Sequence, residues 1–191
     1  MIHAAGVSPA QALYEKVIEI NSIGNINVDK EMLKVMPNGS TILNVSSCSG
    51  YMLPDSMLPK DKYPLALEET PDSFRSAILE VLAKYPEERR SPFAYPISKN
   101  FVIWYTGRMA VENASRKIRV VSIAPGIIRT DISVGETSSI GMAMASPAGR
   151  MAEPEEIARF MEYMIRDDYL NGIDILYYVG TISGMRAKQG Q

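Results

Sequence analysis

Short apolar runs alternate with longer segments of helical periodicity along this 191-residue sequence, and this alternation constrains the fold more than any other feature. The apolar runs cover residues 41–45, 118–124 and 173–179, lengths typical of buried strands. Helices are predicted over residues 13–36, 72–85, 96–113 and 154–167. The order favours the α/β class, with a doubly wound parallel sheet of the Rossmann type, helices on both faces and right-handed crossovers.

The ends of the predicted helices depend on a few residues. In the first helix, Val17, Ile23 and Val28 recur at helical spacing and predict one apolar face. Pro96 is placed near the start of the third helix, where its missing N–H costs little. Pro154 stands among three glutamates, a pattern typical of a helix N-terminus.

Two segments interrupt the alternation and are expected to set substrate specificity. Residues 51–92 contain six prolines and are interpreted as an insertion or lid within a single domain that covers residues 1–191. The alternative is a surface insertion without a role. Residues 132–148 are rich in Gly, Ser, Ala and Met and are expected to be mobile.

Tyr95 and Lys99 form a Tyr-x-x-x-Lys pair on the third predicted helix. Residues four apart lie on one face of a helix, about one turn from each other. A tyrosine alone is a poor acid or base at neutral pH because its pKa is about 10. A neighbouring ammonium favours the phenolate, which makes the tyrosine a usable general acid or base. By itself the pair is a weak signal, since a solvated helix face could carry it by chance.

Further motifs accompany this pair in a fixed order. They are Ala4-Ala5-Gly6 near the start, Asn21 on the first helix, Asn44-Val45-Ser46-Ser47 with Gly50, and Ala124-Pro125-Gly126 followed by Thr130. In order and spacing they resemble the short-chain dehydrogenase/reductase family, over nearly the whole chain. The insertion after Ser47 and Gly149-Arg150 before the last helix are most similar to the 3α-hydroxysteroid dehydrogenase/carbonyl reductase branch.

The resemblance implies an NAD- or NADP-dependent oxidoreductase that interconverts a secondary alcohol and a carbonyl of a small hydrophobic, hydroxysteroid-like substrate. Tyr95 would be the general acid/base, and Lys99 would lower its pKa and bind the nicotinamide ribose. Ser47, rather than Ser46, would hold the substrate oxygen. Asn21 would complete the catalytic set by helping to position Lys99 through a water.

The same resemblance implies a set of cofactor contacts beside Tyr95 and Lys99. They are Ala4, Ala5, Gly6, Pro125, Gly126, Ile128 and Thr130. One departure from the family stands at the front, because no strand and glycine-rich turn of the kind that cradles a pyrophosphate is present. The fold is therefore expected to be incomplete in its N-terminal half. The alternative function is a non-catalytic, truncated family member that acts as an interaction or regulatory module.

Composition limits the partners. A net charge of -2 gives no reason to expect nucleic acid, and no run is long enough to cross a membrane. The single cysteine, Cys48, fits a reducing, cytoplasmic setting. His3 is interpreted as a packing residue, and no group of residues has metal-ligand spacing. The resemblance also implies self-association into a dimer or tetramer.

Overall fold

A four-stranded parallel sheet forms the centre of the protein. The computed structural model describes residues 1–134, 137–180 and 183–184. The strands are β1 (Ile2–His3), β2 (Thr41–Val45), β3 (Arg119–Pro125) and β4 (Asp174–Tyr177). They lie side by side in chain order, so every connection is a crossover between parallel neighbours. The predicted parallel α/β fold is confirmed.

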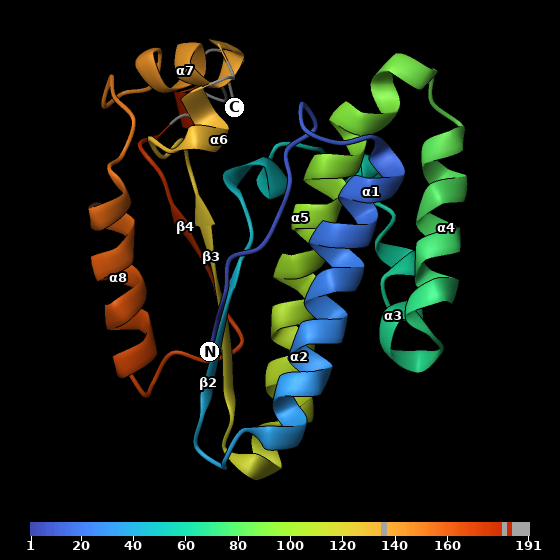
Figure 1. Ribbon diagram of the computed structural model, residues 1–191, viewed down its shortest axis with the longest axis vertical. Coiled ribbons are helices and arrows are strands. Elements are labelled where there is room, and N and C mark those ends of the chain that lie inside the picture. The colour runs from blue at the N-terminus through green and yellow to red at the C-terminus, as the bar shows by residue number, and fades with distance from the viewer. Residues whose placement is uncertain (135–136, 181–182, 185–191) are drawn as a thin grey trace.

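Helices cover both faces of the sheet, as Figure 1 shows. The longer ones are α2 (Gly24–Val35), α4 (Pro71–Ala83), α5 (Glu87–Glu112), α7 (Thr137–Met144) and α8 (Pro154–Arg166), and the five-residue α1 (Tyr14–Ile18) leads through η1 into α2. The shorter ones are η1 (Glu19–Ile23), η2 (Cys48–Tyr51), η3 (Asp55–Met57), η4 (Lys60–Lys62), α3 (Leu65–Glu68), η5 (Ala114–Arg116) and α6 (Asp131–Val134). Helices α1, α2 and α5 lie on one face, and α8 lies on the other (Figure 1). Each face has its own apolar core.

The first predicted helix exists, but a π-helical segment, η1, joins its two halves. A π turn has one residue more than an α turn, so it rotates every later residue around the helix axis. Beyond it, Ile26 and Asp29 face the interior, while Val28 is 39% exposed. The prediction that Val28 shares the apolar face of Val17 is therefore wrong.

The predicted start of the third helix at Pro96 is also wrong, because α5 begins at Glu87 and contains both Pro92 and Pro96. Glutamates in the first turn favour this start through the helix dipole. The added turns are held by packing, since the Phe93 ring stacks on Tyr85 at 4.5 Å between centroids. Tertiary contacts thus outweigh the cost of two prolines in the helix.

Much of the segment 51–92 is packed helix. The predicted helix over 72–85 is observed as α4, which forms an outer layer against α1 and α5 (Figure 1). Phe74 stacks on Phe101 of α5 at 4.4 Å between ring centroids, and Tyr63 is fully buried beside both. This segment therefore contributes to the main core. Its role as a lid stays a prediction.

Helix α8 begins as predicted, with Glu153 as the N-cap and a capping box that includes Glu156. The stretch 132–148, expected to be mobile, carries α6 and α7 in its described part. Among the described residues, no helix is long and apolar enough to cross a membrane.

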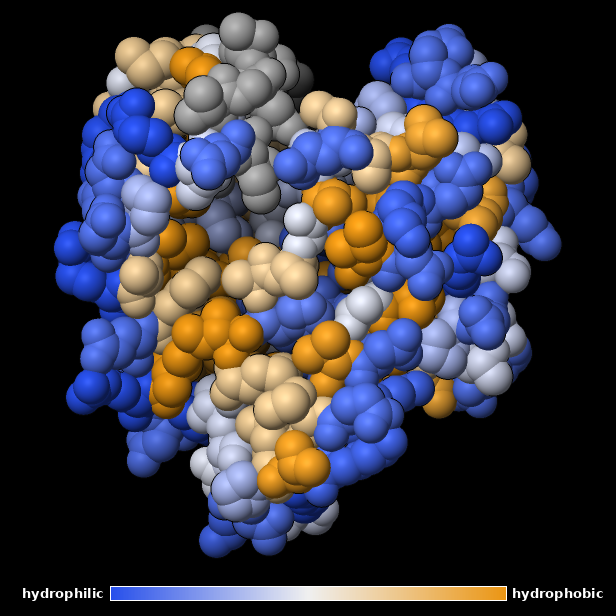
Figure 2. Space-filling model, viewed as in Figure 1, coloured by the Kyte–Doolittle hydropathy of each residue, from blue (hydrophilic) through white to orange (hydrophobic). Residues whose placement is uncertain are grey.

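β1 is one edge of the sheet. Figure 2 shows hydrophobic residues gathered along the middle of the face on which this edge lies. Ile2 of β1 is 50% exposed, so the edge presents an apolar side chain as well as unpaired backbone groups.

Candidate active site

The carboxyl ends of the strands bring the predicted site residues to one edge of the sheet. Ala4–Gly6 follow β1, Ser46 and Ser47 follow β2, and Pro125 ends β3 with Gly126 after it. Because the strands are parallel and in register, these segments are neighbours at that edge. In open α/β sheets this edge is where ligands bind.

Tyr95 and Lys99 lie on one face of α5, as the four-residue spacing predicts. The Lys99 Nζ atom is 6.0 Å from the centroid of the Tyr95 ring. Tyr95 is half-buried against the main core, so its ring is held while part of it remains accessible. The structure thus brings the Lys99 amino group and the Tyr95 ring into one environment.

Lys99 is almost completely buried, at 5% exposure. Burial lowers its pKa from the ordinary value of 10.5 to about 8, because desolvation disfavours the charged form. Nζ donates a 2.9 Å hydrogen bond to the carbonyl oxygen of Val45, at the end of β2. This bond uses one N–H donor of the ammonium. An ammonium has three N–H donors, so Lys99 can bind further oxygens.

Ser47 begins a tight turn, η2, that packs against α5 beside Lys99. An added Cβ on Gly50 would come within 3.1 Å of the Lys99 carbonyl carbon and 3.0 Å of the Asn100 nitrogen. Asn100 fixes this approach by donating a 2.9 Å hydrogen bond from Nδ2 to the Gly50 oxygen. Gly50 is therefore required for the turn to approach α5, and the turn that Ser47 begins packs beside the part of α5 that carries Lys99.

The two adjacent serines have different surroundings. Ser46 is 2% exposed, and its Oγ lies 2.9 Å from the Ile123 oxygen and 2.6 Å from Asp174 Oδ1. Ser47 is partly exposed and accepts hydrogen bonds from the nitrogen and the hydroxyl of Ser49, at 3.2 and 3.0 Å. Its own proton is not used in these two contacts. Ser47 is thus the serine suited to contact a substrate.

Asn21 joins the end of β1 to α5 from its position in the π-helical segment. Its side chain accepts from the Val7 nitrogen at 2.9 Å and donates to the Val7 oxygen at 3.0 Å. It also donates to Ser98 Oγ at 3.3 Å, directly before Lys99. An added Cβ on Gly6 would lie 3.2 Å from Asn21 Oδ1 and 3.4 Å from Lys99 Nζ, so these three residues converge.

The segment after β3 is attached to the residues before α8. Ile128 forms an isolated parallel β-bridge with Ala152, just before α8. Farther along the segment, the Thr130 nitrogen donates a 2.9 Å hydrogen bond to Ser133 Oγ in α6. An added Cβ on Gly126 would meet Tyr178 Cβ at 3.0 Å, which favours glycine there. A hollow of about 190 Å3 is lined by residues that include Gly126 and Ile128. The hollow contains two of the predicted cofactor contacts.

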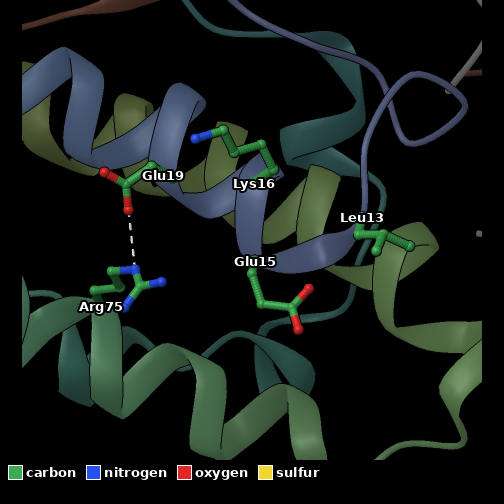
Figure 3. Close-up of a pocket in the computed structure, with 5 residues that line it drawn as sticks. All are labelled: Leu13, Glu15, Lys16, Glu19 and Arg75. Carbon is green, nitrogen blue, oxygen red and sulfur yellow. Dashed lines mark ion pairs between the residues drawn. The ribbon is translucent and has the colours of Figure 1, made fainter.

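Another hollow, of about 440 Å3, lies between α1 and α4 and is drawn in Figure 3. Charged side chains line it, and Arg75 and Glu19 form a 2.9 Å ion pair across it. It contains none of the predicted site residues. In the described part of the chain, no group of three or more His, Cys, Asp and Glu residues could hold a metal ion.

Sequence reasoning missed two polar clusters. Asp174 on β4 accepts hydroxyl hydrogen bonds from the serine turn and from β3. Asp29 on α2 is fully buried, accepts from Asn44 Nδ2 at 2.9 Å and lies 3.9 Å from His3 Nδ1. For Asp174 the sequence offers a signal, an aspartate within an apolar run, whereas Asp29 stands among polar residues and carries none. His3 is buried at 7% exposure, as expected of a packing residue.

Cys48 is buried, and desolvation raises the pKa of its thiol. A raised thiol pKa lowers the thiolate fraction at neutral pH, so Cys48 is a poor nucleophile.

Comparison with known proteins identifies relatives. The family model described as Enoyl-(Acyl carrier protein) reductase matches residues 81–179, just over half of the chain. A short-chain type dehydrogenase/reductase of Sinorhizobium fredii is 27% identical over 96% of this chain and 30% of its own length. Carbonyl reductase family member 4 of Danio rerio is 37% identical over 41% of this chain and 32% of its own length. Each match thus spans about a third of the curated relative.

Solved structures share the fold. A 4-hydroxyisoleucine dehydrogenase mutant complexed with NADH and succinate matches with a TM-score of 0.65, at 23% identity, over 95% of this chain and 67% of that one. ElxO with NADP bound matches with a TM-score of 0.64, also at 23% identity, over 95% and 66%. Together with the family match, this places the chain in the short-chain dehydrogenase/reductase family.

Proposed function

We propose that the protein is an NAD- or NADP-dependent oxidoreductase that interconverts a secondary alcohol and a carbonyl. The observation that carries the proposal is the Tyr95–Lys99 pair, with 6.0 Å between Nζ and the ring centroid, beside the turn that holds Ser47. The pair lies beside the carboxyl end of β2, and in open α/β sheets this edge is where ligands bind.

A proton must move to the substrate oxygen during reduction and away from it during oxidation. Tyr95 would exchange this proton, and the Lys99 ammonium would stabilise the phenolate that forms when Tyr95 gives it up. Ser47 would donate a hydrogen bond to the same substrate oxygen, since its two contacts within the turn use it as an acceptor. Asn21 would position α5 at Lys99 through Ser98.

A nicotinamide cofactor supplies or takes up the hydride when it is bound. The donor set fits the nicotinamide-ribose end of such a group, because buried Lys99 has N–H donors beyond its bond to Val45 and lies beside Gly6 in the loop after β1. The sequence holds no glycine-rich turn for the pyrophosphate end. The contacts expected around it are Ala4, Ala5, Gly6, Lys99, Pro125, Gly126, Ile128 and Thr130. The complexes with NADH and NADP named among the structural neighbours support this choice of cofactor.

We further propose a small hydrophobic carbonyl as substrate and a dimer or tetramer as the assembly. The carbonyl reductase named among the relatives supports the substrate class. The cytoplasmic setting expected from the cysteine content stays a prediction.

The direct test is a fluorescence titration of the purified protein with NADH and NADPH, followed by an assay for carbonyl reduction. We expect weak but saturable binding of at least one dinucleotide, because the sequence holds no glycine-rich turn for its pyrophosphate. We also expect the dinucleotide to be oxidised in the presence of a hydrophobic ketone. Binding without turnover of any alcohol or ketone would contradict the oxidoreductase proposal. Absence of saturable binding would favour the alternative, a non-catalytic interaction or regulatory module.

A further inference from the structure

Asp174 on β4 accepts hydrogen bonds from three hydroxyl groups. Ser46 Oγ lies 2.6 Å and Ser122 Oγ 2.5 Å from its Oδ1 atom, and the Tyr51 hydroxyl lies 2.7 Å from Oδ2. The donors come from the end of β2, from β3 and from the end of η2. One carboxylate, at the start of β4, therefore joins three segments of the chain.

Two of these donors stand on either side of Ser47 in the chain. Ser46 directly precedes it, and Tyr51 is the last residue of the η2 turn that Ser47 caps. Both ends of the turn thus lie within hydrogen-bond distance of the same carboxylate. The single Ser46 proton also has the Ile123 oxygen at 2.9 Å as an acceptor, so the bond from Tyr51 is the more specific attachment. Hydrogen bonds to a charged acceptor are about twice as strong as those between neutral groups, so this attachment can define the position of the turn.

The protonation of Tyr51 and the burial of the two serines also support attachment of the turn to Asp174. Burial, together with the hydrogen bond to Asp174, raises the pKa of Tyr51 well above its ordinary value of 10, so its hydroxyl stays protonated as a donor. Ser46 and Ser122 are buried at 2% and 0% exposure. Loss of the carboxylate would leave buried hydroxyls without their charged acceptor.

We propose that Asp174 is a positioning residue that fixes the turn from Ser46 to Tyr51 and, through it, the Ser47 hydroxyl beside α5. The attachment itself is independent of the proposed function; only the catalytic consequence rests on the role given there to Ser47. Asp174 acts through the turn and need not touch the substrate.

The turn contains its own reporter, because Cys48 is the single cysteine of the chain and is 4% exposed. Its alkylation by iodoacetamide, followed by mass spectrometry without denaturant and at low urea concentrations, measures how often the turn opens. The part of the rate that does not depend on urea reports local opening, and the urea-dependent part reports global unfolding. A parallel urea unfolding curve gives the global stability of each variant.

Asp174→Asn and Tyr51→Phe should each raise the urea-independent alkylation rate by about ten- to a hundredfold, the change expected when a hydrogen bond to a charged group is lost. Ser122→Ala is the matched control. It removes a hydroxyl from the same carboxylate without detaching the turn, so the rate should stay within about twofold of wild type. If Asp174→Asn does not fold, Tyr51→Phe decides, since it retains the carboxylate.

The proposal is overturned if Tyr51→Phe leaves the Cys48 rate unchanged, or if Ser122→Ala raises it equally. The catalytic consequence has a separate readout. In a protein with measurable carbonyl reduction, Tyr51→Phe should lower kcat on the order of tenfold while the KM for the dinucleotide stays within about twofold. A raised Cys48 rate with unchanged kcat would refute the positioning role. Absence of any wild-type activity would refute the proposed function, while the Cys48 rates would still decide the attachment.

Discussion

Replacement of Lys99 by methionine should change how the stability of the protein depends on pH. Burial lowers the pKa of Lys99 from 10.5 to about 8 in the folded protein, whereas an unfolded chain exposes this lysine to water. Between these two values the unfolded state binds more protons, so the free energy of unfolding rises with pH. The cost of the buried charge is fully present below about pH 8 and is removed as the pH approaches 10.5. A shift of this size corresponds to about 3 kcal/mol.

The assay is urea unfolding of the wild type and Lys99→Met at intervals from pH 7 to pH 10.5, with the difference in free energy plotted against pH. Taking the difference removes the titration of the tyrosines distant from Lys99. Placing both proteins in a Tyr95→Phe background removes the titration of Tyr95, whose ring lies beside the lysine. The free energy of unfolding of the wild type, minus that of Lys99→Met, should rise by about 3 kcal/mol from pH 7 to pH 10.5. Lys34→Met, at a side chain that is 66% exposed, is the control and should give a flat difference. A flat or falling difference for Lys99→Met would refute the reasoning.

Four other substitutions test the packing of the turn, the hydrogen bonds of Asn21 and the ion pair at the start of α8. Gly50→Ala should lower the free energy of unfolding, measured in urea, by about 1–3 kcal/mol, because the added carbon meets the backbone of α5. At Gly141 an added carbon meets nothing within 4 Å, so Gly141→Ala should leave that free energy unchanged or raise it by up to about 1 kcal/mol. Equal effects would contradict this. Asn21→Ala should lower the free energy of unfolding by on the order of 3 kcal/mol, since the buried groups of Val7 and Ser98 lose their hydrogen bonds. A change within error would show that these groups find other partners. The pKa of Glu156 is lowered from 4.5 to about 2, mainly by the hydrogen bond from Arg150. The stabilisation that ionised Glu156 contributes to the folded protein is therefore present above about pH 4.5 and is lost as the pH falls through about 2. Glu156→Gln should lack that dependence in an acid titration of helicity, and an unchanged titration would argue against the ion pair.

The strands and most helices could be predicted because their signals are local. The run 41–45 coincides with β2, and Pro154 with its glutamates marks the start of α8 as the structure has it. The errors arose where the helical pattern alone did not determine the backbone. The phase of α2 depends on a π turn that follows no composition rule, and α5 begins before Pro92 because its first turns pack on Tyr85.

The candidate site likewise has one part that the sequence predicts and one that it does not. Tyr95 and Lys99 were predictable from spacing on one helix, which fixes their shared face. The attachment at Asp174 was not, because its donors Ser46, Tyr51 and Ser122 are brought together only when the strands pair. An aspartate in an apolar strand signals an interior polar contact, but the sequence does not say with which residue.

The measurement that bears most directly on the proposed chemistry is the kcat of Tyr95→Phe for carbonyl reduction, with the dissociation constant of the dinucleotide measured beside it. The variant keeps the ring and loses only the hydroxyl that would exchange the proton. We predict a fall in kcat of about a hundredfold or more, with a dissociation constant within about threefold of wild type. A variant that retains most of the wild-type kcat would contradict the assignment of Tyr95 as the general acid/base.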